Sequence, residues 1–187
     1  MKFHATPIAG LTIVSLEPRL DERGFFARSV CHDEFAKAGL SADFVQSNMS
    51  YNRNRGIVRG LHYQIAEHAE VKLVRCIHGA VFDVAVDLRP DSETFLHWFG
   101  VELSAENRQA LYIPKGFAHG YQALTDDAEL FYQVSTPYCG PAERSVRFDD
   151  PRVGIEWPLP ITQVSPKDLA TAHLAEPDLL HLLEKLS

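Results

Sequence analysis

The sequence has few cysteines, and they follow no pattern of a metal site or a disulfide framework. Only three occur among 187 residues, namely Cys31, Cys76 and Cys139. They are odd in number and widely spaced, and no CxxC pair is present, which disfavours both kinds of site. We therefore expect incidental or buried thiols in a protein of the reducing cytoplasm.

Long apolar runs and an excess of positive charge are also lacking. No run approaches the roughly 20 apolar residues of a membrane span, and Pro7 and Gly10 interrupt the N-terminal stretch that could resemble a signal peptide. The net charge of −7 disfavours nucleic acid and anionic membranes as partners. Since no repeat, low-complexity tract or linker is visible, we expect a single domain over residues 1–187.

Short strand-like segments fill the middle of the chain. In "AVFDVAVDLR" (80–89), large apolar residues at even positions alternate with two aspartates at odd ones. Further strands are predicted in "HWFGVELS" (97–104) and "ELFYQVS" (129–135), with turn residues between the segments. This pattern predicts a mainly β fold, an antiparallel sandwich or barrel. We also expect a short helix at 31–40, closed by Gly39, and a C-terminal helix at 176–187.

Four residues could be compared with the metal ligands of a cupin barrel, whose motifs run G-x5-H-x-H, Glu, and later P-x-G-x-x-H. Gly56 and His62 have the first spacing, and "PKGFAH" (114–119) matches the last motif and ends at His119. The second histidine, however, is replaced by Gln64, and an amide is a poor ligand for a transition metal. With Glu70 also loosely spaced, we predict the barrel without a bound metal.

Several polar residues lie on strand faces that otherwise look apolar. Lys72 shares a face with Val74 and Cys76, which fits either an edge strand or a pocket. Taken alone, His62 could be a hydrogen-bonded structural histidine, and Tyr132 a core residue with a satisfied hydroxyl. None of these signals is specific by itself.

Seven segments, found in order between residues 21 and 168, together resemble the nucleotide-sugar 3,5-epimerases, typified by dTDP-4-dehydrorhamnose 3,5-epimerase. The segments are "DERGFF" (21–26), "QSNMSYNRNRGIVRGLHYQ" (46–64), "KLVRCIHGAVFDVAVDLR" (72–89), "IPKGFAHGY" (113–121), "ELFYQVSTPY" (129–138), "DDPRVGIEWP" (149–158) and "SPKD" (165–168). The resemblance implies a cupin-like jelly roll with a few short peripheral helices. It also implies a cofactor-independent isomerase that inverts C3 and C5 of a nucleotide-linked 4-keto-6-deoxyhexose.

The same resemblance implies catalytic roles for four residues. His62 is the base that removes the carbon proton, and Asp168 orients and stabilises its imidazole. Without that pairing, Asp168 could instead be a helix cap. Lys72 stabilises the enolate oxygen, and Tyr132 is the acid on the opposite face of the ring.

Substrate-binding residues follow from the resemblance too. They are Arg23, Phe26, Gln46, Asn48, Arg59, His119, Tyr138 and Glu143. The segment with Arg23 and Phe26 is implied to reach the neighbouring subunit's site, hence a homodimer with shared sites. Arg28 stands where the family often has a base-contacting acid, which leaves the nucleobase open. A mono-epimerase acting at C3 or C5 alone, a metal-dependent cupin enzyme and a non-catalytic binding module are the alternatives.

Overall fold

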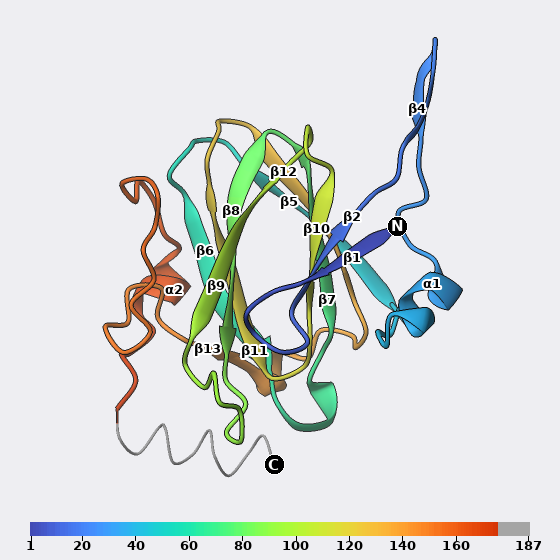
Figure 1. The fold of residues 1–187 in the computed structure, drawn as a ribbon. Helices are drawn as coiled ribbons and strands as arrows, with labels where there is room; N and C mark the ends of the chain where they lie inside the picture. The colour runs from blue at the N-terminus through green and yellow to red at the C-terminus, as the bar shows by residue number, and fades with distance from the viewer. Residues whose placement is uncertain (176–187) are drawn as a thin grey trace.

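Two antiparallel sheets face each other and form the body of the protein (Figure 1). The computed structural model describes residues 1–175. The first sheet has the strand order β1 (Lys2–Ala5), β2 (Thr12–Ser15), β10 (Gln109–Ile113), β7 (Lys72–His78), β12 (Ala128–Val134) and β5 (Gln46–Asn52). The second has the order β13 (Glu143–Ser145), β6 (Val58–Gln64), β11 (Phe117–Ala123), β8 (Ala80–Asp87) and β9 (Trp98–Ser104). The predicted mainly β, jelly-roll-like sandwich is confirmed.

Smaller elements lie around this sandwich. They are the helices α1 (His32–Lys37) and α2 (Pro166–Leu169), the 3-10 turns η1 (Ala66–His68) and η2 (Gly140–Ala142), and the hairpin of β3 (Arg19–Asp21) and β4 (Gly24–Phe26). Gly39, with a φ of +73°, follows α1 as predicted. The expected C-terminal helix at 176–187 lies outside the described residues. No helix in residues 1–175 is long and apolar enough to cross a membrane.

Three apolar clusters hold the layers together. The first lies between the sheets and includes Val74 and Leu130 from one sheet and Ala85 from the other. The second covers the outer face of the second sheet beneath residues 146–174, where Trp157 packs. The third joins the outer face of the first sheet to Phe35 of α1. The interior between the sheets therefore does not have to supply all of the apolar burial, and it can hold polar groups.

Strand β8 shows how polar groups reach that interior. Its alternation is as predicted, but the strongly apolar face, with Val84 and Val86, points outward into the second cluster. The other face, with Asp83 and Ala85, points between the sheets. Asp83 is fully buried there, so it needs a hydrogen-bond partner inside the barrel.

Two glycines let strands β6 and β11 approach closely beside the polar interior. A Cβ on Gly60 would lie 2.7 Å from both the Cα of Gly120 and the carbonyl oxygen of His119. Gly60 also has a φ of +110°, which favours glycine. The ladder next to this contact pairs His62 directly with His119. Glycine at these positions thus permits the close approach of the two strands beside the paired histidines.

Candidate active site

Two adjoining cavities between the sheets share the side chains of His62, Lys72 and Tyr132. We call them the Tyr138 lobe, of about 300 Å³, and the His119 lobe, of about 320 Å³. The Tyr138 lobe is lined by Gln46, Asn48, His62, Tyr63, Gln64, Glu70, Lys72, Tyr132, Val134, Tyr138 and Glu143. The His119 lobe is lined by Met49, Ser50, Arg59, His62, Lys72, His119, Gly120, Tyr121 and Tyr132. Strands of both sheets therefore bring the proposed base, acid and ammonium to one cavity.

His62 forms a short contact with Asp168. The Nε2 atom of His62 lies 2.7 Å from Oδ1 of Asp168, and these side chains are 32% and 3% exposed. Burial by itself raises the pKa of Asp168, but hydrogen bonds from His62, Ser165 and the Gly60 amide outweigh burial and lower it. An ionised carboxylate at this distance favours the imidazolium that forms when His62 accepts a proton.

Helix α2 supplies this carboxylate, and Asp168 is not the helix cap. The N-cap is Ser165, whose hydroxyl oxygen accepts a hydrogen bond from the Asp168 amide. The Asp168 side chain is thus free to point at His62 across the chain. Pairing of His62 with Asp168 had been expected only from the resemblance, and the geometry is consistent with it.

Lys72 lies at the start of a central strand, between β10 and β12, and not at a sheet edge. Only 7% of the residue is exposed. Its Nζ atom donates to the His62 carbonyl oxygen at 3.2 Å and lies 3.2 Å from Oε1 of Glu70. Of the two alternatives for Lys72, an edge position is wrong and a pocket position is right.

Tyr132 comes from the neighbouring strand β12 and lines both lobes. Burial, followed by the nearby Tyr121 and Glu70, raises its pKa above the usual 10.0. The phenol is therefore protonated across the physiological range and can donate a proton. Its ring packs at the edge of the central apolar cluster, which explains why Tyr132 could also be interpreted as a core residue.

A second histidine–aspartate pair lies in the His119 lobe. Nε2 of His119 is 2.9 Å from Oδ1 of Asp83, and both residues are buried. Oδ2 of Asp83 has no hydrogen-bond partner among the described residues. The pair fixes the ring of His119 beside the cavity, which His119 lines. Asp83 was not among the predicted site residues, although an aspartate on an otherwise apolar strand was a visible signal.

The polar rim of the Tyr138 lobe is connected by hydrogen bonds. Gln46 donates to Oδ1 of Asn48 at 3.0 Å and accepts from the Tyr138 amide at 3.2 Å. The Tyr138 hydroxyl donates to Glu143 at 2.9 Å. The Tyr138 side chain is 61% exposed at the rim. All four of these predicted binding residues line the same lobe.

Lys167 also reaches this rim, and sequence reasoning missed it. Its Nζ atom lies 2.5 Å from Oε2 of Glu143. Lys167 directly precedes Asp168 in "SPKD", so its proximity to the site could have been inferred from that neighbour. The cation adds positive charge near the exposed ring of Tyr138.

Arg59 and the β3–β4 hairpin are placed differently from each other. Arg59 lines the His119 lobe, where its guanidinium donates to Oδ1 of Asn52 at 2.8 Å and to the Tyr51 carbonyl oxygen at 2.9 Å. The hairpin instead projects away from the barrel (Figure 1). Its residues Arg23 and Phe26 are exposed and line neither lobe of this chain. Within one chain, these two predicted site residues are therefore not brought to the site.

Gln64 and Glu70, two of the residues compared above with cupin metal ligands, make hydrogen bonds and an ion pair with protein side chains. Gln64 donates to Oε2 of Glu70 at 3.0 Å, and Glu70 contacts the Lys72 ammonium. Within residues 1–175, no group of three or more His, Cys, Asp or Glu side chains is arranged to hold a metal ion. Glu70 thus links Gln64 to the ammonium group of Lys72.

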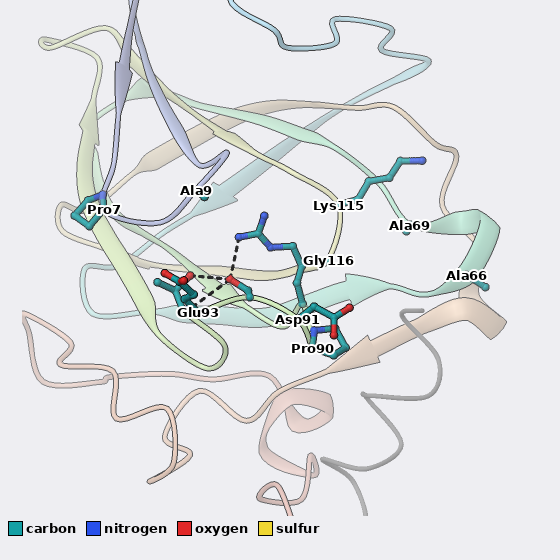
Figure 2. Close-up of a pocket in the computed structure, with 12 residues that line it drawn as sticks. Pro7, Ala9, Ala66, Ala69, Pro90, Asp91, Glu93, Lys115 and Gly116 are labelled. Atoms are coloured by element: carbon teal, nitrogen blue, oxygen red, sulfur yellow. Dashed lines mark hydrogen bonds between the residues drawn. The ribbon is translucent and has the colours of Figure 1, made fainter.

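A larger cavity, of about 870 Å³, lies away from this site and shares none of its residues (Figure 2). Arg89, which lines it, is bound to Asp87 through two hydrogen bonds of 2.8 and 2.7 Å. Ser92 and Thr94 donate to the same carboxylate. These polar side chains serve to hold the loop after β8, so size alone does not make this cavity the active site.

The comparison with known proteins agrees with the arrangement of the site. The model of the family described as dTDP-4-dehydrorhamnose 3,5-epimerase matches residues 5–176. The chain belongs to this family. It is therefore an isomerase, with the cupin-like fold that the family shares.

Individual relatives cover most of the chain. The dTDP-4-dehydrorhamnose 3,5-epimerase of Shigella flexneri is 46% identical over 160 residues, which are 84% of this chain and 88% of the relative. The dTDP-4-dehydrorhamnose 3-epimerase of Streptomyces niveus is 38% identical over 177 residues, 94% of this chain and 85% of that protein. A solved structure of the Legionella pneumophila 3,5-epimerase, in complex with dTDP-4-keto-L-rhamnose, has a TM-score of 0.88 at 41% identity and covers 95% of this chain and 96% of its own.

Proposed function

We propose that this protein epimerises a dTDP-linked 4-keto-6-deoxyhexose at C3 and C5. The observation that carries the proposal is the convergence of His62, Lys72 and Tyr132 on both lobes of one cavity. The 3,5-epimerases among the relatives support the same substrate class. The three unpaired cysteines fit a reaction in the cytoplasm.

His62 is the base in this proposal. A C–H bond beside a ketone is a very weak acid, so its removal needs a base held at the carbon and a group that stabilises the enolate. His62 accepts the proton on Nδ1, because Nε2 faces Asp168. The carboxylate then stabilises the imidazolium through the 2.7 Å contact.

Lys72 and Tyr132 complete the reaction. The ammonium of Lys72 interacts with the oxygen on C4, whose negative charge grows as the enolate forms. Tyr132, whose phenol is kept protonated by burial, delivers a proton to the carbon from the opposite ring face. Because the base and the acid act from opposite sides, the carbon is inverted. No cofactor is required by this scheme, since no net oxidation occurs.

The nucleotide end occupies the rim. Tyr138 offers an exposed ring for stacking on the nucleobase, and Arg59 provides a guanidinium for the diphosphate. Gln46, Asn48, His119 and Glu143 supply hydrogen bonds along the cavity. Arg28 forms a 2.6 Å ion pair with Glu34 in its own chain. In this proposal Arg28 therefore does not select the nucleobase, and other contacts do.

A homodimer with shared sites is part of the proposal. Arg23 and Phe26 lie on a hairpin that projects from the barrel, and Leu20 and Phe26 there are 80% and 72% exposed. Exposed apolar side chains on a projecting hairpin fit insertion into a second copy. The test is to mix a His62→Ala protein with an Arg23→Ala protein. If sites are shared, each mixed dimer has one intact site, and activity returns to about a quarter of the wild-type value. No recovery after subunit exchange would contradict the shared site.

Inversion of C3 alone is the second candidate, because a relative that covers 94% of the chain is a 3-epimerase. One experiment tests both. The protein is incubated with dTDP-4-keto-6-deoxyglucose in deuterated water, and the sugar protons are followed by NMR. Deuterium at C3 and C5 with inversion of both supports the main proposal, and deuterium at C3 alone supports the second. No exchange with this substrate or its CDP and GDP analogues would refute both.

A further inference from the structure

A chain of buried polar contacts leads from the Lys72 ammonium to the rim of the cavity. Glu70 lies two residues before Lys72, and its side chain is only 10% exposed. One carboxylate oxygen of Glu70 contacts Nζ of Lys72 at 3.2 Å, and the other accepts from the Gln64 amide at 3.0 Å. Both oxygens are thus held in place, so the carboxylate cannot rotate away without losing a contact.

The contacts of Lys72 determine what remains for the substrate. An ammonium group has three N–H donors. In this structure, one is directed to the His62 carbonyl oxygen, and the Glu70 carboxylate holds the ammonium from a second side as an ion pair at 3.2 Å. An N–H that points away from these two oxygens is left for a group in the cavity, since Lys72 lines both lobes. One hydrogen bond and one ion pair therefore orient the ammonium whose free N–H the enolate oxygen would receive.

Gln64 connects this ammonium to the segment that carries Tyr138. Its Oε1 atom accepts from the Cys139 amide at 2.6 Å, and its Nε2 atom also lies 3.4 Å from the Pro137 carbonyl oxygen. These two contacts flank Tyr138 on either side. Gln64 is 4% exposed, so a change at its amide would leave buried partners without a hydrogen bond.

We propose that Glu70 is a positioning residue that holds the Lys72 ammonium so that a free N–H points into the cavity, and that Gln64 couples this ammonium to the position of Tyr138. The inference rests on the proposed function for the roles of Lys72 and Tyr138. It adds two residues that act through them. Glu70 acts on the chemical step, whereas Gln64 acts on both the chemical step and nucleotide binding.

Three variants test the role of Glu70. Glu70→Ala lowers kcat for epimerisation at least about tenfold, with KM within about twofold, because the oxyanion donor is misdirected. Glu70→Gln gives a kcat between those of Glu70→Ala and wild type, since its amide oxygen can still face Lys72 while its NH2 group replaces the oxygen that accepted from Gln64. Glu67→Ala is the matched control on the same loop, where the side chain is 81% exposed, and it leaves kcat unchanged. A full rate for Glu70→Ala, or a Glu70→Gln rate as low as that of Glu70→Ala, overturns the proposal.

A double-mutant cycle separates positioning from a general loss of structure. In a Lys72→Met protein, Glu70→Ala changes the remaining rate by less than about threefold, because its effect passes through Lys72. An equal drop in both backgrounds contradicts that route.

Crystal structures of the Glu70 variants give a readout that does not depend on turnover. In Glu70→Ala, the Lys72 ammonium leaves the His62 carbonyl oxygen, whereas in Glu67→Ala and Glu70→Gln it stays. An unmoved ammonium in Glu70→Ala refutes the positioning role even if the protein proves not to be an epimerase. Missing wild-type turnover refutes the proposed function instead.

The coupling to Tyr138 is tested with Gln64→Met, which is of similar length but has no amide. This variant raises KM at least about fivefold and also lowers kcat, in contrast to Glu70→Ala. Should Gln64→Met fail to fold, Gln64→Asn serves, because its shorter amide cannot reach Glu70 and Cys139 together. An unchanged KM in the folded variant overturns the coupling.

Discussion

Replacing Asp168 by Asn removes one charge from the buried pair with His62 and nearly preserves the shape. When His62 takes a proton, an imidazolium forms whose charge lies roughly 4 Å from that of the carboxylate. At an effective dielectric constant of about 20, their attraction is about 4 kcal/mol. Its loss from the transition state corresponds to a decrease in kcat of about 10³-fold. We expect that decrease with nearly unchanged nucleotide binding, because Asp168 lines neither lobe.

The assay is the initial rate of sugar epimerisation, with dTDP affinity measured by calorimetry. Asp43→Asn is the control, since Asp43 has a side chain that is 74% exposed. A kcat for Asp168→Asn within threefold of wild type would refute the reasoning.

Stability against pH gives a second readout for the same variant. The pKa of Asp168 is lowered from 3.8 in the folded protein. Its contribution to the free energy of unfolding is therefore present above pH 3.8 and is lost as the pH falls through the folded value. The difference in stability between wild type and Asp168→Asn should shrink below pH 3.8. A difference that stays constant through this range would contradict the assigned ionisation.

Two further predictions concern Tyr132 and Gly60. Because burial raises the pKa of Tyr132 above 10.0, ionisation of Tyr132 should cause no loss of kcat below pH 10. A kcat–pH profile of wild type and Tyr132→Phe checks this. An alkaline loss of kcat below pH 10 that is present in wild type and absent in Tyr132→Phe would contradict the protonated state of Tyr132. Gly60→Ala should destabilise the protein by about 1–3 kcal/mol through overpacking, because its Cβ would lie 2.7 Å from Gly120. Gly24→Ala on the hairpin is the control, because φ is +129° there but an added Cβ would meet no atom of other residues, its two chain neighbours aside, within 4 Å. It measures the backbone cost in the same urea unfolding experiment, and equal losses for both variants would argue against the close contact.

The sequence predicted the strands well, because alternation over short segments separates the residues of a strand into two distinct faces. It did not reveal which face of β8 points inward. The apolar side of that strand is covered by residues 146–174, and a contact so distant in sequence is invisible to local periodicity. The aspartate face was therefore free to enter the interior, where Asp83 holds His119.

The site was predicted in part for a similar reason. Residue spacing alone could not decide between an edge and a pocket for Lys72, and the family motifs supplied its role. Lys167 and Asp83 were missed because each reaches the cavity through a tertiary contact, to Glu143 and His119 respectively. Arg23 lies on a hairpin that reaches neither lobe of its own chain, and its place in a second copy's site remains part of the proposed function.

The central claim is that His62 removes a proton from one face of the sugar and Tyr132 returns one from the other. The most direct measurement compares deuterium incorporation and sugar configuration, by NMR in deuterated water, for wild type, His62→Ala and Tyr132→Phe. The account predicts that His62→Ala loses exchange, whereas Tyr132→Phe still exchanges a proton through His62 but returns it to the same face without inversion. Full exchange in His62→Ala, or inversion at the wild-type rate in Tyr132→Phe, would contradict it.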